Sequence, residues 1–73
     1  MIRIKTVALH IGNARRAKNI TQRELAGLLN VSPQAVSKWE RGIAFPDLAL
    51  IDELADQIGL SIEELLLEKK QDN

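Results

Sequence analysis

The sequence predicts a small all-α domain, a compact bundle of five short helices, on three observations. Aromatic residues make up only 3% of the 73 residues, and a chain with few aromatic and β-branched residues is a poor candidate for an all-β fold. Apolar residues recur three and four positions apart, as on the inner face of a helix. Signals that start and stop helices interrupt this pattern at short intervals. Cysteine is absent, so the apolar core has to stabilise the domain without disulfides.

The first helix is predicted over residues 6–18. Residues 1–6 alternate apolar and polar side chains, which is typical of a strand, but the run is too short to form a sheet alone. We expect it to be an N-terminal extension. Val7 and Ile11 then begin a helical stripe, and Asn19 suits the end of this helix because asparagine tolerates the left-handed backbone conformation.

The second helix is predicted over residues 21–29. Thr21 and Glu24 have the spacing of a capping box, in which each side chain accepts a hydrogen bond from the backbone N–H of the other residue. The apolar stripe that follows ends at Leu29, and Asn30 marks the break before the next helix.

The third helix is predicted over residues 32–41. Ser32 suits the N-cap and Pro33 the first helical position. Val36 and Trp39 mark the inner face, so we expect Trp39 to be a core residue and not a stacking surface for a ligand.

The last two helices are predicted over residues 47–58 and 61–67. Gly59 ends the first of them in the usual C-terminal manner, and Ser61 opens a second capping box. Residues 68–73 are a polar tail.

Charge is balanced in sum but not in position. The chain has ten basic and ten acidic residues, which argues against a polycation that binds nucleic acid through charge alone. Residues 1–41 hold eight basic and two acidic residues, a net charge of +6, whereas residues 42–73 hold two basic and eight acidic residues, a net charge of −6. A basic half of this kind attracts polyanions.

Only Asn30, Val31 and the N-cap Ser32 join the second and third predicted helices, so these helices must cross at a steep angle, as in a helix-turn-helix. In that motif the second helix enters the major groove of DNA. With Val36 and Trp39 turned to the core, the helical period directs polar side chains the opposite way. These side chains belong to Gln34, Ser37, Lys38 and Arg41. Their amide, hydroxyl, ammonium and guanidinium groups are of the kinds that bind base edges and phosphates.

On these residues the chain resembles the Cro/repressor-type helix-turn-helix family, also called the XRE family. The resemblance covers residues 11–66, about three quarters of the chain. Its matching runs include Ile20-Thr-Gln-Arg-Glu-Leu-Ala26 and Gln34-Ala-Val-Ser-Lys-Trp-Glu-Arg-Gly42. The resemblance implies a phage-repressor-like bundle of five helices that binds an operator as a dimer.

The resemblance also implies roles for single residues. Base-reading positions are matched by Gln34 and Lys38, with Ser37 beside them. Gln22 matches a phosphate contact and Arg41 is positioned for another. Thr21 and Arg23, beside Gln22, are expected to add phosphate contacts, with a solvated surface charge as the alternative for Arg23. A buried ion pair between the first and third helices is matched by Arg15 and Glu40. The chain departs from some relatives at Pro33, which cannot read a base, and from many at Asn30, where glycine is common and asparagine should preserve the turn.

We therefore expect a cytoplasmic, sequence-specific double-stranded DNA-binding transcriptional regulator, a small bacterial or phage repressor-like protein. Residues 7–67 would form its helix-turn-helix domain. Its expected partner is a palindromic operator, bound by a homodimer that forms at least on DNA, with residues 1–6 and 65–67 as candidate dimer surfaces. No membrane, cofactor or metal is expected.

The main alternative is a helix-turn-helix fold that acts as a protein-interaction module or an antitoxin-like partner. Its surface would come from apolar residues that the core does not need, namely Ile2, Ile4, Leu9 and Leu67. An enzyme is not expected, because the sequence has no nucleophile–base pair, no metal cluster and no glycine-rich phosphate loop.

Overall fold

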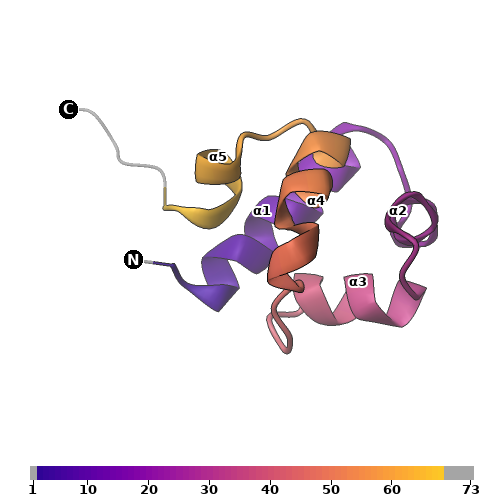
Figure 1. Cartoon of the computed structure of the whole chain (residues 1–73), viewed down its shortest axis with the longest axis horizontal. Coiled ribbons are helices and arrows are strands. Elements are labelled where there is room, and N and C mark those ends of the chain that lie inside the picture. The colour runs from indigo at the N-terminus through magenta and orange to yellow at the C-terminus, as the bar shows by residue number, and fades with distance from the viewer. Residues whose placement is uncertain (1, 69–73) are drawn as a thin grey trace.

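The structure, a computed structural model, describes residues 2–68 and confirms the all-α prediction for them. These residues form five α-helices and one turn of 3-10 helix, η1 (Figure 1). The elements are α1 (Ile4–Ala17), α2 (Gln22–Leu29), α3 (Pro33–Glu40), η1 (Leu48–Leu50), α4 (Ile51–Ile58) and α5 (Ile62–Leu66). None of these helices has the length and apolar character needed to cross a lipid bilayer.

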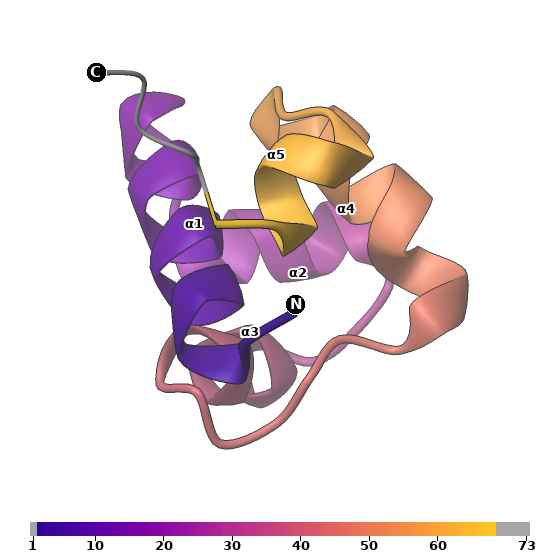
Figure 2. The same ribbon diagram turned by 90° about the vertical axis from the view of Figure 1, so that its left-hand side faces the viewer.

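The helices α1 and α4 run through the middle of the molecule, with α2 and α3 on one side and α5 on the other (Figure 1). Seen from the α5 side, α2 and α3 lie behind the other three helices (Figure 2). All five α-helices contribute to one apolar core, whose largest fully buried side chains are Val7, Ile11, Leu25, Val36, Leu54 and Leu65. Trp39 is only 5% exposed and joins this core, which confirms the prediction made for it.

Within the described residues, every positive φ angle lies one or two residues after the end of a helix. These residues are Asn19 (64°), Asn30 (59°), Gly42 (72°) and Gly59 (77°). At Asn30 the left-handed conformation makes the short turn between α2 and α3 without a glycine, as the sequence predicts.

The first helix begins at Ile4, two residues before its predicted start, so residues 4–6 are helical and are not part of an extension. Its first hydrogen bond runs from the N–H of Val7 to the carbonyl of Arg3, at 3.0 Å. Ile4 lies three residues before Val7 and therefore continues the apolar stripe by one turn. The alternation that suggested a strand was compatible with this longer helix.

The last helix ends at Leu66, and Leu67 is extended. Leu67 forms an isolated antiparallel bridge with Ile2, so the two ends of the described chain meet. Of the predicted polar tail, only Glu68 lies among the described residues.

The helix predicted over 47–58 starts with the tighter turn η1 and becomes α-helical only at Ile51. Asp47 explains the tight start. Its carboxylate accepts a hydrogen bond from the N–H of Ala49 at 3.2 Å, and its carbonyl accepts from the N–H of Leu50 at 2.8 Å. Both bonds close shorter loops than an α-helical bond does, which is typical of an aspartate that begins a turn.

Candidate nucleic-acid interface

The candidate interface is built on the corner between α2 and α3. Thr21 and Glu24 form the predicted capping box: Thr21 Oγ1 accepts from the Glu24 N–H at 2.9 Å, and Glu24 Oε1 accepts from the Thr21 N–H at 2.8 Å. Ser32 Oγ accepts from the N–H of Ala35 at 3.1 Å. These caps fix where each helix starts, and Asn30 turns the chain between them. Local backbone geometry at this turn therefore contributes to the angle between α2 and α3.

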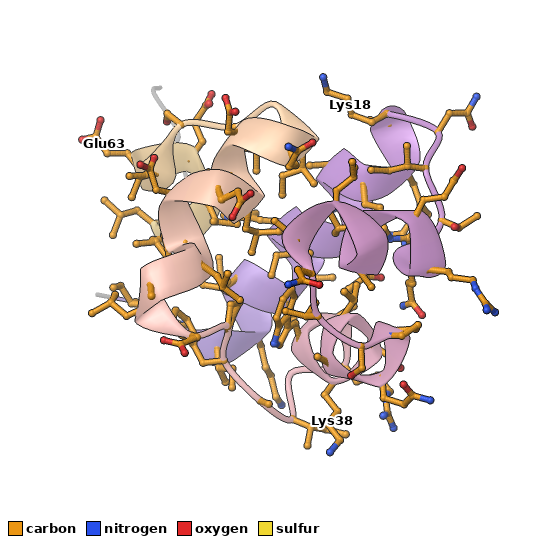
Figure 3. All side chains as sticks on the ribbon, turned by 45° about the vertical axis from the view of Figure 1, so that its right-hand side comes forward. Lys18, Lys38 and Glu63 are labelled. Atoms are coloured by element: carbon orange, nitrogen blue, oxygen red, sulfur yellow. The ribbon has the colours of Figure 1, made fainter. Side chains whose placement is uncertain are left out.

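The outer face of α3 carries hydrogen-bond donors. Gln34, Lys38 and Arg41 are exposed there, and Ser37 is half-buried beside them. Lys38 extends away from the bundle (Figure 3). Arg41 Nε donates to the carbonyl of Ser37 at 3.4 Å. Glu40, the acidic residue of α3, is turned inward to α1, so this outer face presents no carboxylate.

Three residues expected to bind phosphate lie at the start of α2, and they differ in exposure. Thr21 and Arg23 are exposed, and Arg23 forms no ion pair with any residue in 2–68. Gln22 is half-buried, and its Nε2 donates to Glu40 Oε1 at 3.0 Å. The sequence analysis did not anticipate this contact between α2 and the end of α3.

Arg15 and Glu40 form an ion pair that ties α1 to α3. Arg15 Nε lies 2.6 Å from Glu40 Oε2, and Arg15 Nη2 lies 3.0 Å from Glu40 Oε1, a two-point contact. The two side chains are 11% and 7% exposed. Arg15 Nη1 also donates to the carbonyl of Ile20 at 2.8 Å. One guanidinium therefore holds α3 and the α1–α2 link at the same time.

The protonation states of this pair follow from its surroundings. Burial alone would raise the pKa of Glu40, but the hydrogen bonds from Arg15 and Gln22, together with the charges of Arg15 and Arg16, outweigh it and hold the pKa below its ordinary value. The hydrogen bond to Glu40 raises the pKa of Arg15, against the opposing effect of burial. Both groups are therefore charged at neutral pH.

The sequence analysis missed Gly12, which makes room for the ion pair. Gly12 is buried in the middle of α1. A Cβ atom at this position would lie 3.3 Å from Glu40 Oε1 and 3.2 Å from Arg16 Nη1. The available signal was a glycine inside a helical pattern, since glycine there is unfavourable unless something must approach the backbone closely.

Acidic side chains gather away from α3. Asp52, Glu53 and Asp56 are exposed on α4 and, with Ala49, line a shallow hollow. On α5, Glu63 projects on the opposite side of the molecule from Lys38 (Figure 3). The charge asymmetry of the sequence is therefore preserved in space: α3 presents its basic and polar side chains, and the acids of α4 and α5 lie elsewhere.

Residues 11–65 match the family described as Helix-turn-helix. The chain is 40% identical over 52 residues to the HTH-type transcriptional activator BcrR of Enterococcus faecalis, a match that covers 71% of this chain and 26% of that protein. It is 31% identical over 66 residues to Multiprotein-bridging factor 1 of Candida albicans, covering 85% and 44% of the two chains. The chain thus spans less than half the length of these relatives.

The fold resembles solved structures over a larger share of their length. The P22 c2 repressor, crystallised with a synthetic operator, superposes with a TM-score of 0.78 and 28% identity, covering 82% of this chain and 91% of that one. The restriction-modification controller protein C.AhdI from Aeromonas hydrophila gives a TM-score of 0.78 and 27% identity, covering 86% and 96%. On the family match and these folds, the chain belongs to the XRE-type helix-turn-helix family.

Proposed function

We propose that this chain is a sequence-specific double-stranded DNA-binding transcriptional regulator, without enzymatic activity, that inserts α3 into the major groove. One observation carries the proposal: the outer face of α3 presents donors without an acid, held at a fixed angle to α2. The similar activator of Enterococcus faecalis and the operator complex of the P22 repressor support it.

In this proposal Gln34 and Lys38 contact bases. The Gln34 amide can pair with N6 and N7 of adenine, and Lys38 can donate to O6 or N7 of guanine or to a nearby phosphate. Ser37, being half-buried, would assist from the flank. Arg41 lies one turn beyond Lys38 and is suited to a phosphate.

The N-terminus of α2 would bind a second phosphate. The backbone N–H groups at a helix start attract anions, and Thr21, Gln22 and Arg23 surround this one. The hydroxyl hydrogen of Thr21 remains available because the capping bond uses only its oxygen as an acceptor.

The proposal includes a homodimer on a palindromic operator, because residues 2–68 offer a single helix-turn-helix. One helix-turn-helix covers one half-site, and two half-sites lie about 34–36 Å apart along the DNA. Of the expected dimer segments, Ile2 and Leu67 are exposed and are joined by an antiparallel bridge, which supports one shared surface in place of two separate ones, whereas Leu65 is fully buried in the core and cannot contribute to it.

Selection of bound fragments from a random duplex pool tests the function directly. We expect enrichment of paired half-sites at moderate salt. The variant Gln34→Ala/Lys38→Ala should lose the enrichment, while Asp52→Asn, on the outer face of α4, should retain it. Folded protein that enriches no sequence would overturn the proposal.

A second candidate function is protein binding. Leu9, Ile2 and Leu67 are 62%, 51% and 42% exposed, and Leu67 lines a groove of about 610 Å³ between α1 and α5. A gel shift separates the candidates, because an interaction module would leave duplex DNA unshifted at moderate salt.

A further inference from the structure

The contact between Gln22 and Glu40 determines how the Gln22 amide is oriented. A carboxylate can only accept hydrogen bonds. At 3.0 Å from Glu40 Oε1, the group that Gln22 presents must therefore be its NH₂, and the amide oxygen is turned away from Glu40. Without such a partner the terminal amide torsion has two broad, nearly equivalent wells.

Glu40 is itself held too firmly to follow Gln22. Arg15 binds both of its carboxylate oxygens, at 2.6 and 3.0 Å, and Arg15 is in turn fixed by the carbonyl of Ile20 at 2.8 Å. Within residues 2–68 no buried side-chain nitrogen or oxygen lacks a partner. The carboxylate is thus a fixed acceptor that selects one of the two orientations of the Gln22 amide.

The Gln22 NH₂ has two hydrogens, and Glu40 Oε1 takes one of them. The second hydrogen is not used by Glu40. Gln22, which carries it, is half-buried at the first position of α2. The capping box satisfies the N–H groups of Thr21 and Glu24, but among the described residues the N–H groups of Gln22 and Arg23 have no acceptor, as is usual at a helix start. Three N–H donors are therefore available at the start of α2.

We propose that Glu40 is a positioning residue for DNA binding: it orients the Gln22 amide so that the second Nε2–H, with the backbone N–H groups of Gln22 and Arg23, meets a DNA phosphate. The inference rests on the proposed function. It gives the ion pair a second role, because the same carboxylate that anchors α3 to α1 also prepares the phosphate contact of α2. With the amide reversed, its oxygen would face the phosphate and repel it.

A double-mutant cycle on DNA affinity tests this role. Gln22→Ala should weaken binding roughly tenfold on every duplex, since one hydrogen bond to a charged group is lost. Glu40→Gln should weaken binding less in the Gln22→Ala background than in the wild type, because its effect passes through Gln22. Equal weakening in both backgrounds would mean that Glu40 acts only through the fold, which overturns the proposal. Circular dichroism establishes that each variant is folded at the temperature used.

If Glu40→Gln does not fold, NMR of the wild type decides the question. In the free protein, one Gln22 Nε2 proton should exchange slowly with water and the other quickly. Adding a duplex taken from the random-pool selection should shift the fast proton and leave the slow one in place. The proposal would be overturned if both Gln22 Nε2 protons exchange equally fast in the free protein, or if the slowly exchanging proton loses its protection when DNA is added.

The same titration separates this inference from the proposed function. If no duplex shifts the amide signals of α3, the DNA-binding proposal fails and the inference fails with it. If the α3 signals shift while the two Gln22 protons behave alike, DNA binding stands and only the positioning role is overturned.

Discussion

The helices α3 and α4 have the same length, eight residues, but they differ in how they are attached and in what they expose. The attachment of α4 is apolar, through Ile51, Leu54, Ala55 and Ile58. α3 buries Val36 and Trp39 and adds the ion pair of Glu40 with Arg15. Outward, α4 presents acids and α3 presents donors.

This difference shows which features the fold requires. Apolar burial is non-directional and roughly proportional to area, so it is sufficient to hold α4 in place. A two-point ion pair also fixes orientation, which matters for a helix whose outer face must meet a partner at a defined angle. The ion pair is therefore found on the helix that carries the candidate interface.

Removing the charged attachment should have the largest effect. Arg15→Ala leaves the Glu40 carboxylate buried and unpaired, and we expect it to lower the free energy of unfolding by about 3–5 kcal/mol, close to the whole stability of a small domain. Urea denaturation measures this. Arg23→Ala, which removes an exposed arginine with no ion pair within residues 2–68, is the matched control and should change stability by less than about 0.5 kcal/mol. An Arg15→Ala protein as stable as wild type would show that the ion pair does not hold α3.

Removing a buried apolar side chain of α4 tests the apolar attachment of this helix in the same way. Leu54 is fully buried, and Leu54→Ala should destabilise the domain by about 2–5 kcal/mol through lost burial and a cavity. Unlike the loss of stability caused by Arg15→Ala, the loss of stability caused by Leu54→Ala should be the same in acid and at neutral pH. A strongly pH-dependent loss would contradict the purely apolar attachment of α4.

Two residues of the α3 outer face should affect DNA binding in different ways. Gln34→Ala should weaken binding to the selected site by about 1–3 kcal/mol and relax preference at one base position, whereas Arg41→Ala should weaken all sequences alike and lower the salt slope by about one. Affinities on single-base variants and across a salt series measure both effects. If Gln34→Ala keeps the relative preference for every variant, the assignment of the outer face is wrong.

Acid should remove the stabilisation that the ion pair of Glu40 provides. Because the folded-state pKa of Glu40 is below its ordinary value, the ionised pair stabilises the protein at neutral pH. This stabilisation is lost as the pH falls below the ordinary glutamate pKa, about 4.3, and through the folded-state pKa. The difference in unfolding free energy between wild type and Glu40→Gln should therefore shrink in acid. A difference that stays constant would exclude Glu40 as the responsible group.

Two helical glycines provide the finest test. Gly27 is exposed on α2 with nothing within 4 Å of its Cβ position, so Gly27→Ala should stabilise the protein by up to about 1 kcal/mol. Gly12→Ala gains the same propensity but crowds Glu40 Oε1 at 3.3 Å, and we expect a net loss of about 1 kcal/mol from overpacking. Thermal melts of the two variants should move in opposite directions. Equal gains would mean that the ion pair can shift aside.

The fold was predictable because each helix carries local signals. The capping box at Thr21 and the left-handed position of Asn30 depend on neighbours in sequence, and such signals can be read without the structure. The start of α1 was misplaced because Arg3 provides no side-chain cap. The contact of Gln22 with Glu40 joins residues 18 positions apart, and no local pattern indicates it.

The antiparallel bridge between Ile2 and Leu67 has a consequence for how the domain can be combined with others. Both segments lie on the side of the molecule away from α3 (Figure 1). When chain ends are close together and at the surface, a domain tolerates circular permutation and insertion into a host protein. A fluorescent or effector module joined close to Ile2 or Leu67 would emerge from that side and leave the outer face of α3 uncovered.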